Sequence, residues 1–252
     1  MGWTGMTLFV WRASFESIPA NKCCSNERRH VNLPNMSWKH CGPGRRGYHH
    51  GNLREALIES ALSLIGEKGP AGFTIAEAAR SAGVSPAAPY RHFRDREELM
   101  AEVARLGFER FANDLEKAWH GGRPSPLEAL QSVGRAYLAF ARNEPAYYAA
   151  MFETGLPKAL NAGLQESADR ALDALYAATK KLVEKLPEDS RPPCQMVALH
   201  IWAMSHGIAS LFGRGNAQTG SAISPEELLE AGVLLYLRGL GLAGGAAPAA
   251  TL

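Results

Sequence analysis

The chain has 252 residues, of which 46% are hydrophobic, so it can bury a core in one large domain or two small ones. Its formal net charge of +2 at pH 7 neither requires nor excludes a nucleic-acid partner. The charges are unevenly placed: residues 28–54 hold six Lys or Arg, four His and no acid, whereas residues 120–252 hold twelve acids and eleven bases. This distribution predicts two regions with different tasks.

The four cysteines show no C-x-x-C spacing, so neither a zinc ribbon nor a thioredoxin-type redox site is indicated. A metal site near the N-terminus would have to use the cysteines and histidines there, and their spacing fits no standard metal-binding pattern. These residues are Cys23, Cys24, His30, His40 and Cys41. We therefore expect reduced thiols, no metal and no cofactor. No stretch approaches the roughly 18 apolar residues of a membrane span, and the start lacks the basic region of a signal peptide. These features predict a cytoplasmic protein without a membrane partner.

Residues 1–44 show no sustained periodicity, so we expect a disordered or non-native extension, with Met36 as a plausible alternative start. Helical spacing begins at Asn52 and continues to Ile65, ending at the glycines and proline of "GEKGPAG". Thr74 and Glu77 form a T-x-x-E capping box for a second helix. A third helix is expected with Ser85 as its N-cap and Pro86 at its first position.

Asp95 and Glu98 repeat the capping logic for a fourth helix, which runs to Trp119. The segment "HGGRPSP" at 120–126 is the clearest break in the chain. Beyond it the periodicity predicts only helices, over residues 126–142, 145–153, 157–186, 193–212 and 225–240, the last opened by a capping box from Ser224 to Glu227. A flexible tail is expected over residues 243–252. The predicted fold class is therefore all-α.

Two helices separated by a short turn with a glycine outline a helix-turn-helix. Gly83 allows the left-handed conformation that such a turn needs, and the small residues Pro86, Ala87 and Ala88 would let the backbone approach a DNA groove closely. Pro89 has no amide hydrogen to donate to the capping residue's carbonyl. An ordinary helical hairpin is the alternative interpretation.

At this point the residues resemble a known family. "FTIAEAARSAGVSPAAPYRHFRDREEL" and "GYHHGNLREALIESALSLIGEKG" are similar to the DNA-binding domain of tetracycline-repressor-type (TetR) regulators, over Gly47 to about Leu106. "HIWAMSHGIASLF" at 200–212 resembles the Trp-His-Gly signature of one C-terminal subclass. The resemblance implies a three-helix DNA-binding head, an all-helical ligand-binding and dimerisation domain, and usually repression relieved by a small molecule. Ala88-Pro89 departs from the bulkier residue that many members carry there.

The domains expected on this basis are an extension over 1–44, a helix-turn-helix domain over 45–95, a helical domain over 96–242 and a tail over 243–252. The DNA-binding candidates are basic or aromatic side chains for phosphates, a basic arm ahead of the first helix, and small residues for the groove. They are Arg45, Arg46, Tyr48, Thr74, Ser85, Pro86, Ala87, Ala88, Tyr90, Arg91, His92 and Arg96. Few side chains in this set can form bidentate hydrogen bonds with a base, so we expect DNA shape and contacts to the DNA backbone to matter.

The candidates for an effector cavity are aromatic or adaptable side chains of the C-terminal region: Trp119, Tyr137, Tyr148, Met151, Phe152, Trp202 and His206. A plain core is the alternative for most of them, and a hydrogen-bonded structural histidine is the alternative for His206. The helices at 193–212 and 225–240 are the expected dimer seam, because they carry apolar and small residues with few charges: Trp202, His206, Gly207, Leu228, Val233, Leu235 and Tyr236.

These features predict a homodimeric repressor that binds a palindromic operator in double-stranded DNA and is released by an unidentified small-molecule effector. The alternative is a ligand-independent DNA-binding or architectural protein whose C-terminal region only dimerises. An enzyme is not expected, because the motifs G-x-S-x-G, H-E-x-x-H and G-x-x-x-x-G-K-[ST] do not occur. G-x-G-x-x-G occurs at 42–47 and 239–244, but no predicted strand precedes it at either place, as a dinucleotide site requires.

The first prediction concerns the N-terminal extension. A chain that starts at Met36 should fold and bind DNA like the full chain, because residues 1–35 have no apolar face to contribute to a core. Circular dichroism and a DNA mobility shift would measure this. A loss of helical signal on truncation would show that the segment is structured.

Overall fold

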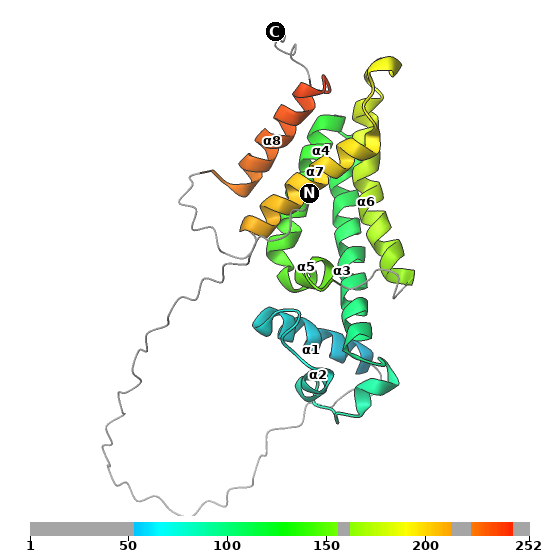
Figure 1. Ribbon diagram of the computed structural model, residues 1–252, viewed down its shortest axis with the longest axis vertical. Coiled ribbons are helices and arrows are strands. Elements are labelled where there is room, and N and C mark those ends of the chain that lie inside the picture. The colour runs from blue at the N-terminus through cyan, green and yellow to red at the C-terminus, as the bar shows by residue number, and fades with distance from the viewer. Residues whose placement is uncertain (1–52, 156–161, 213–222, 244–252) are drawn as a thin grey trace, which may run out of the picture. The chain divides into compact units, whose positions relative to one another are not determined.

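A computed structural model of the chain describes residues 53–155, 162–212 and 223–243, and these residues form helices and connecting loops without a strand (Figure 1). They all belong to one unit of the chain, His49–Leu252. The helices follow in the order α1 (Leu53–Lys68), α2 (Ile75–Ser81), the 3-10 helix η1 (Ala88–Arg91), α3 (Arg96–Trp119), η2 (His120–Gly122), α4 (Pro126–Asn143), α5 (Pro145–Phe152), α6 (Ala162–Val183), η4 (Glu188–Ser190), α7 (Cys194–Phe212) and α8 (Pro225–Gly239). The predicted all-α class is confirmed.

Several predictions fall outside the described residues and stay predictions. They concern the extension over 1–44, the arm residues Arg45, Arg46 and Tyr48, the first residues of the helix expected at 157–186, and the tail beyond residue 243. The boundary expected at residue 95 also stays a prediction. For reference, residues 53–95 are called the head and residues 96–243 the body. No helix of the described ranges combines the length and the apolar character that crossing a membrane requires.

The expected caps define where the helices begin. The Thr74 hydroxyl accepts from the Glu77 amide at 3.2 Å, and the Glu77 carboxylate accepts from the Thr74 amide at 2.8 Å, which completes the predicted capping box of α2. The box from Ser224 to Glu227 opens α8 in the same way. At α3, Asp95 accepts from the Glu98 amide at 2.8 Å, whereas the Glu98 carboxylate accepts from the Arg94 amide at 2.6 Å. These reciprocal bonds satisfy amides that a helix leaves unpaired.

The third helix differs from the prediction. Residues 86–87 form a turn, and only Ala88–Arg91 form a 3-10 helix, whose N-cap is Ala87 without a side-chain hydrogen bond. The Ser85 carbonyl accepts from the Ala88 amide at 3.0 Å, which is a turn of the 3-10 type. Pro89 is the reason, because it has no amide to donate to Ser85 and disfavours the α conformation at the residue before it. Ser85 therefore does not cap an α-helix.

α3 is shared by the head and the body. It packs on α1 in the head and on α4, α5 and α6 in the body (Figure 1). Its fully buried side chains include Leu99, Val103 and Phe111. A single 24-residue helix, about 36 Å long at 1.5 Å per residue, thus connects the two regions.

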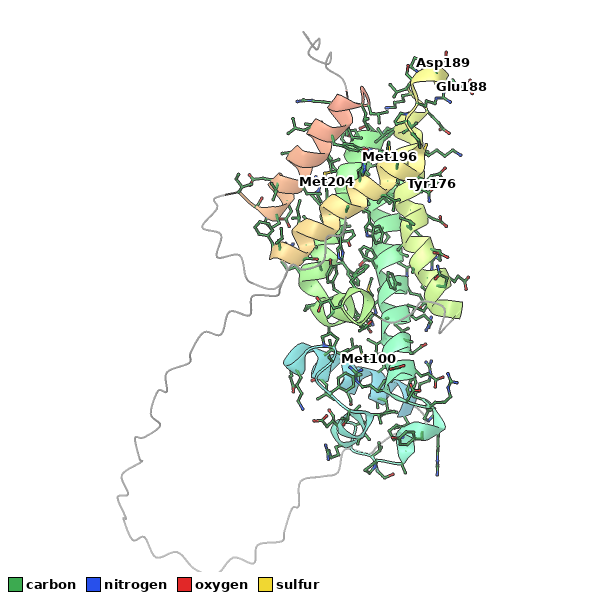
Figure 2. All side chains as sticks on the ribbon, viewed as in Figure 1. Met100, Tyr176, Glu188, Asp189, Met196 and Met204 are labelled. Atoms are coloured by element: carbon green, nitrogen blue, oxygen red, sulfur yellow. The ribbon has the colours of Figure 1, made fainter. Side chains whose placement is uncertain are left out.

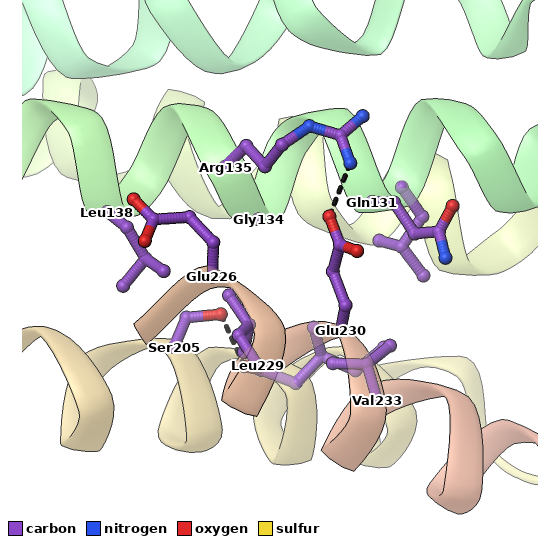
Figure 3. Close-up of a pocket in the computed structure, with 11 residues that line it drawn as sticks. Gln131, Gly134, Arg135, Leu138, Ser205, Glu226, Leu229, Glu230 and Val233 are labelled. Carbon is purple, nitrogen blue, oxygen red and sulfur yellow. Dashed lines mark hydrogen bonds and ion pairs between the residues drawn. The ribbon is translucent and has the colours of Figure 1, made fainter. Parts of the chain in front are cut away.

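The last helix is attached to the body through α4 and α7. α8 buries Leu229, Val233 and Leu237 on its inner face. At its polar edge, Glu230 pairs with Arg135 and Glu226 pairs with Arg142 of α4, the latter at 2.7 Å; Figure 3 shows the first pair beside the small cavity between these helices. That cavity has about 10 Å³ of free space, so it accepts one water molecule at most.

An ion-pair cluster joins α1 to α3. The Glu102 carboxylate, on a side chain 5% exposed, pairs with Arg54 of α1 at 2.9 Å and with Arg105 at 2.8 Å. Arg105 also pairs with Glu109. Although burial raises the pKa of Glu102, the hydrogen bonds from Arg105 and Arg54 outweigh it and leave the pKa below its ordinary value. Glu102 therefore stays ionised and holds the two helices together.

The second prediction concerns this cluster. Glu102→Ala should lower the free energy of unfolding by about 2 kcal/mol, because it removes charge-assisted hydrogen bonds from two arginines. Urea unfolding would measure this. Glu109→Ala is the matched control, since Glu109 contacts the same Arg105 from a side chain 39% exposed, and it should cost under about 1 kcal/mol. Equal costs for the two variants would contradict a specific role for Glu102.

Candidate DNA-binding and effector sites

The turn ahead of η1 has the geometry that a helix-turn-helix needs. Gly83 adopts the left-handed conformation, with φ at +72°. Its amide donates to the Arg80 carbonyl at 3.0 Å, and the Val84 amide donates to the Ala79 carbonyl at 2.9 Å. This pair of bonds is a Schellman motif, which ends α2 and turns the chain toward η1. The left-handed glycine expected from the sequence is confirmed.

Two buried residues anchor η1 and set which side chains face outward. Pro89 and Phe93 are buried, and the Arg54 guanidinium lies 5.5 Å from the centre of the Phe93 ring. The residues between them point away from the core: Tyr90 has 57% of its surface exposed, and Arg91 and His92 are exposed. The spacing of the two buried anchors therefore presents one hydroxyl and two basic side chains together.

The small residues predicted to face a groove lie beside this group. Ser85, Pro86 and Ala87 are exposed, and Ala88 is half-buried. None of the four carries a long side chain, so the backbone of the turn forms the surface at this point. Arg80 and Arg94 are also exposed on the head and were not among the candidates, although their charge and position were readable in the sequence.

Thr74 is exposed, but its side chain already has a structural role. Its hydroxyl accepts from the Glu77 amide and also lies 3.0 Å from the Glu77 carboxylate. Lys68 donates to the same carboxylate at 2.8 Å. The Lys68 ammonium, together with the Thr74 amide and hydroxyl, lowers the pKa of Glu77 to about 2. Glu77 therefore ties the end of α1 to the start of α2.

Arg96 points into the head. Its guanidinium donates to the carbonyl of Pro70 and lies 4.9 Å from the centre of the Phe73 ring. The residue is half-buried. This placement holds the loop before α2 against α3, and the phosphate contact expected from the sequence stays a prediction.

The aromatic candidates of the body form one packed cluster, with Trp119 as the exception. Phe111 of α3 meets Tyr137 at 4.9 Å and Trp202 at 6.1 Å between ring centres, both edge-to-face. Phe152 lies 4.9 Å from Tyr148 and 6.2 Å from Trp202. Such edge-to-face pairs add to the stabilisation from burial. The cluster therefore fills the space between α3, α4, α5 and α7.

Two candidates pack elsewhere. Met151 faces α3 at Gly107, where an added Cβ would come within 2.8 Å of the Met151 sulfur. Trp119 lies at the end of α3, where its ring contacts Gly122 and the Lys181 ammonium lies 5.5 Å from its centre. Phe111 and Trp119 are eight residues apart, about 12 Å along the helix, so the structure does not bring Trp119 to the cluster.

His206 is the polar centre of the aromatic cluster. Its Nδ1 lies 3.0 Å from the Tyr137 hydroxyl and 2.9 Å from the Tyr148 hydroxyl. Burial lowers the pKa of His206, while the Glu153 carboxylate raises it by a smaller amount. Burial, with Tyr148 nearby, raises the pKa of Tyr137. A neutral ring whose unprotonated Nδ1 accepts from one of these two hydroxyls fits these directions.

The space available to a ligand is not inside this cluster. The cavity lined by Tyr137, Trp202 and Ser205 has about 10 Å³ of free space, enough for one water molecule at most. A cleft of about 590 Å³ lies instead between the end of α1 in the head and α5 and α7 in the body. Of the seven effector candidates, Tyr148 alone lines that cleft. Most of its other lining residues are glycines, alanines and prolines, which no sequence pattern marks as ligand-binding.

α7 and α8 leave apolar side chains exposed. Met196, Leu199 and Leu211 of α7 are 41%, 47% and 69% exposed, and Figure 2 shows Met196 on the side of α7 near Tyr176 of α6. Leu228 and Leu235 of α8 are 40% and 68% exposed. Three of the residues expected at the dimer seam have contacts within the chain. Val233 is buried, and Trp202 and His206 belong to the aromatic cluster. Tyr236 bonds His200 at 2.8 Å.

Comparison with known proteins covers both regions. Residues 57–103 match the family "Bacterial regulatory proteins, tetR family", and residues 130–236 match "Tetracyclin repressor-like, C-terminal domain". The description of the C-terminal match does not name the Trp-His-Gly subclass, which stays a prediction.

Among curated relatives, the HTH-type transcriptional regulator BetI of Rhizobium meliloti (strain 1021) is 42% identical over 82 residues, covering 32% of this chain and 40% of BetI. AcrR of Shigella flexneri, also an HTH-type transcriptional regulator, is 31% identical over 81 residues, covering 32% of this chain and 37% of AcrR. The chain thus aligns with about two fifths of the length of these relatives. Both are described as regulators and not as enzymes.

Among solved structures, a protein of unknown function from Rhodococcus sp. RHA1 has a TM-score of 0.64 and 29% identity, covering 77% of this chain and 98% of that protein. The TetR family transcriptional regulator PfmR from Thermus thermophilus has a TM-score of 0.57 and 24% identity, covering 73% of this chain and 98% of PfmR. At that identity, the likeness to PfmR shows the fold alone.

The third prediction concerns His206. Its folded pKa lies below the ordinary value of 6.5, so the unfolded chain binds a proton there first as the pH falls. The stabilisation from the neutral ring is complete above about pH 6.5 and is lost as the pH falls toward the folded pKa. His206→Gln should therefore weaken the loss of stability between pH 7.5 and 5.5 in urea unfolding. His92→Gln, on an exposed histidine, should leave that pH dependence unchanged.

An unchanged pH dependence in His206→Gln would contradict this assignment. So would an equal change in both variants, because it would show that the effect does not depend on burial in the aromatic cluster.

Proposed function

The chain belongs to the tetR family of bacterial regulatory proteins, and from this premise we propose that it is a homodimeric transcriptional repressor released from a palindromic operator by a small molecule. The single observation that carries the proposal is the surface of the head from Ser85 to His92. There the buried Pro89 and Phe93 present Tyr90, Arg91 and His92 beside a turn of small residues.

We infer that the two groups on this surface have different tasks. The Tyr90 hydroxyl and the Arg91 and His92 side chains are suited to phosphate oxygens, which position a protein on DNA without reading its sequence. Ser85, Pro86 and Ala87 let the backbone approach the base edges. Because no side chain of this turn can form a bidentate pair with a base, much of the sequence preference should come from DNA shape. Arg96 acts in this proposal as a positioning residue within the head.

A second copy of the chain is needed, because one helix-turn-helix head reads one half-site. The exposed apolar side chains of α7 and α8 support a seam between copies at these helices: Met196, Leu199, Leu211, Leu228 and Leu235. Gly207 is half-buried on α7, and an added Cβ there meets nothing within 4 Å. The two heads would then lie about one DNA turn, roughly 34–36 Å, or a multiple of it apart.

The shared helix α3 supports a route from effector to DNA. A ligand that favours one angle between head and body changes the distance between the two heads of a dimer. A preference of about 1.4 kcal/mol for the non-binding arrangement changes operator occupancy tenfold. The ligand-independent alternative is separated by one measurement: release of bound operator DNA by a small molecule excludes it.

The fourth prediction tests the DNA-facing turn. Sites bound by the full chain would first be selected from random DNA. Ala87→Gln should then abolish or change the preferred sequence, because it places a long polar side chain where the backbone meets the groove. Circular dichroism should stay helical. Ala177→Gln, on an exposed alanine of α6, is the matched control and should keep the original preference. An unchanged preference in Ala87→Gln would remove this turn from the interface.

The fifth prediction tests the seam. Gly207→Glu should give monomers that lose the palindromic site, because two like charges would meet across a symmetric interface. The single chain should still fold, since the new side chain has open space around it. Sedimentation velocity would measure the mass. Gln165→Glu adds the same charge on an exposed position of α6 and should remain dimeric. A dimeric Gly207→Glu protein would place the seam elsewhere.

A further inference from the structure

We propose that Arg80 is a further DNA contact of the head and that its guanidinium binds a phosphate of the DNA backbone. This rests on the proposed function, since it requires the head to bind DNA. It adds a contact from α2 to those already proposed for Tyr90, Arg91 and His92. The head then holds the DNA from both helices of the motif.

The ion pairs of the head leave two of its basic side chains free. Three of its five lysines and arginines have acidic partners: Arg54 with Glu102 at 2.9 Å, Lys68 with Glu77 at 2.8 Å, and Arg94 with Glu98 at 3.2 Å. Within the described ranges, the other two, Arg80 and Arg91, have no ion pair and no side-chain hydrogen bond. Both are exposed. An exposed guanidinium of this kind can bind a phosphate without first giving up a carboxylate.

The carboxylate on α2 is already engaged. Glu77 lies three residues before Arg80, a spacing at which helical side chains are neighbours. Its carboxylate instead accepts from the Lys68 ammonium and from the Thr74 amide, both at 2.8 Å. Lys68 and the Thr74 groups lower the pKa of Glu77 to about 2, so it stays ionised and paired at neutral pH. The capping box at the start of α2 therefore leaves the charge near its end uncompensated.

The place of Arg80 in the motif suits a phosphate rather than a base. In a helix-turn-helix, the first helix crosses the DNA backbone and the second enters the groove. α2 is the first helix here, and Arg80 is exposed in its last turn. Ala78 and Ala79 of the same helix are fully buried, so α2 packs on the head through one side and leaves Arg80 outside. A guanidinium can bind a phosphate through two parallel charge-assisted hydrogen bonds.

The turn after α2 fixes Arg80 relative to the surface proposed to face the groove. The Arg80 carbonyl accepts from the Gly83 amide at 3.0 Å, and the Ala79 carbonyl accepts from the Val84 amide at 2.9 Å. These bonds hold the end of α2 against the turn that leads to Ser85. A phosphate bound by Arg80 therefore sets the angle at which the small residues of the turn enter the groove.

The test uses the full chain and the DNA sites that it selects from random sequence. Arg80→Gln should weaken binding about tenfold for each bound head, because it removes a charge-assisted hydrogen bond. The loss should be equal for the preferred site and for sites with single base changes. Arg80→Lys should retain most of the affinity, because an ammonium also pairs with phosphate. Mobility shifts would measure these affinities.

The matched control is Arg123→Gln. Arg123 is an exposed arginine beyond the far end of α3, so the variant loses the same charge away from the head and should bind like the wild type. Glutamine has a helix propensity close to that of arginine, so α2 should stay folded in Arg80→Gln. Circular dichroism would verify this.

Modified DNA distinguishes a phosphate contact from a structural role at the end of α2. One phosphate at a time, at equivalent places of both half-sites, is replaced by an uncharged methylphosphonate. At one position the wild type should lose affinity while Arg80→Gln loses no more, because its contact there is already absent. Wild-type sensitivity of Arg80→Gln at every position would overturn the proposal. So would a loss confined to one base pair, which would make Arg80 a base-reading residue.

The two proposals fail in different ways. A full chain that selects no DNA sequence would overturn the proposed function and this contact with it. A chain that selects and binds DNA, and whose Arg80→Gln variant binds like the wild type, would overturn the contact alone and leave the regulator standing.

Discussion

The whole arrangement depends on one helix that belongs to two cores. The N-terminal part of α3 packs on α1, and the rest packs on α4, α5 and α6. Side chains are buried along most of its length, from Leu99 in its first turn to Leu115 near its end. Because packed helices do not bend freely, a shift of the body helices around α3 moves the base of the head as well. The Glu102 cluster strengthens this connection on the polar side of the same helix.

The head shows how a short helix can present side chains without being an α-helix. Pro89 prevents the regular hydrogen bond to Ser85, and η1 is a single 3-10 turn as a result. What holds it in place is burial of Pro89 and Phe93, not backbone hydrogen bonding along a helix axis. The exposed tyrosine, arginine and histidine between them gain a fixed direction from those two anchors. Rigidity of this kind lowers the entropy lost on binding.

Local signals in the sequence were sufficient for most helix boundaries. The capping boxes of Thr74 and Ser224 involve residues three apart, so they can be identified without knowing the fold. The same local signals were misleading at Ser85. Pro86 suits the first position of a helix, but Pro89 has no amide hydrogen for the α-helical bond to the Ser85 carbonyl. The contact of Arg96 with the Pro70 carbonyl could not be predicted for another reason: the two residues are 26 positions apart, and no local pattern connects them. The cleft could not be predicted, since its walls come from four segments whose separation is fixed only by packing.

The attachment of α8 has a consequence for how DNA affinity would vary with ionic strength. Its pairs with α4, Arg135–Glu230 and Arg142–Glu226, involve side chains between 30% and 58% exposed, so dissolved salt screens them. The same salt weakens phosphate contacts by competing for the DNA. A plot of log affinity against log salt would then contain two contributions, one from the head and one from the helix that is proposed to lie at the seam. Its slope would be steeper than the roughly 0.9 per contacted phosphate that the proposed DNA contacts alone would give.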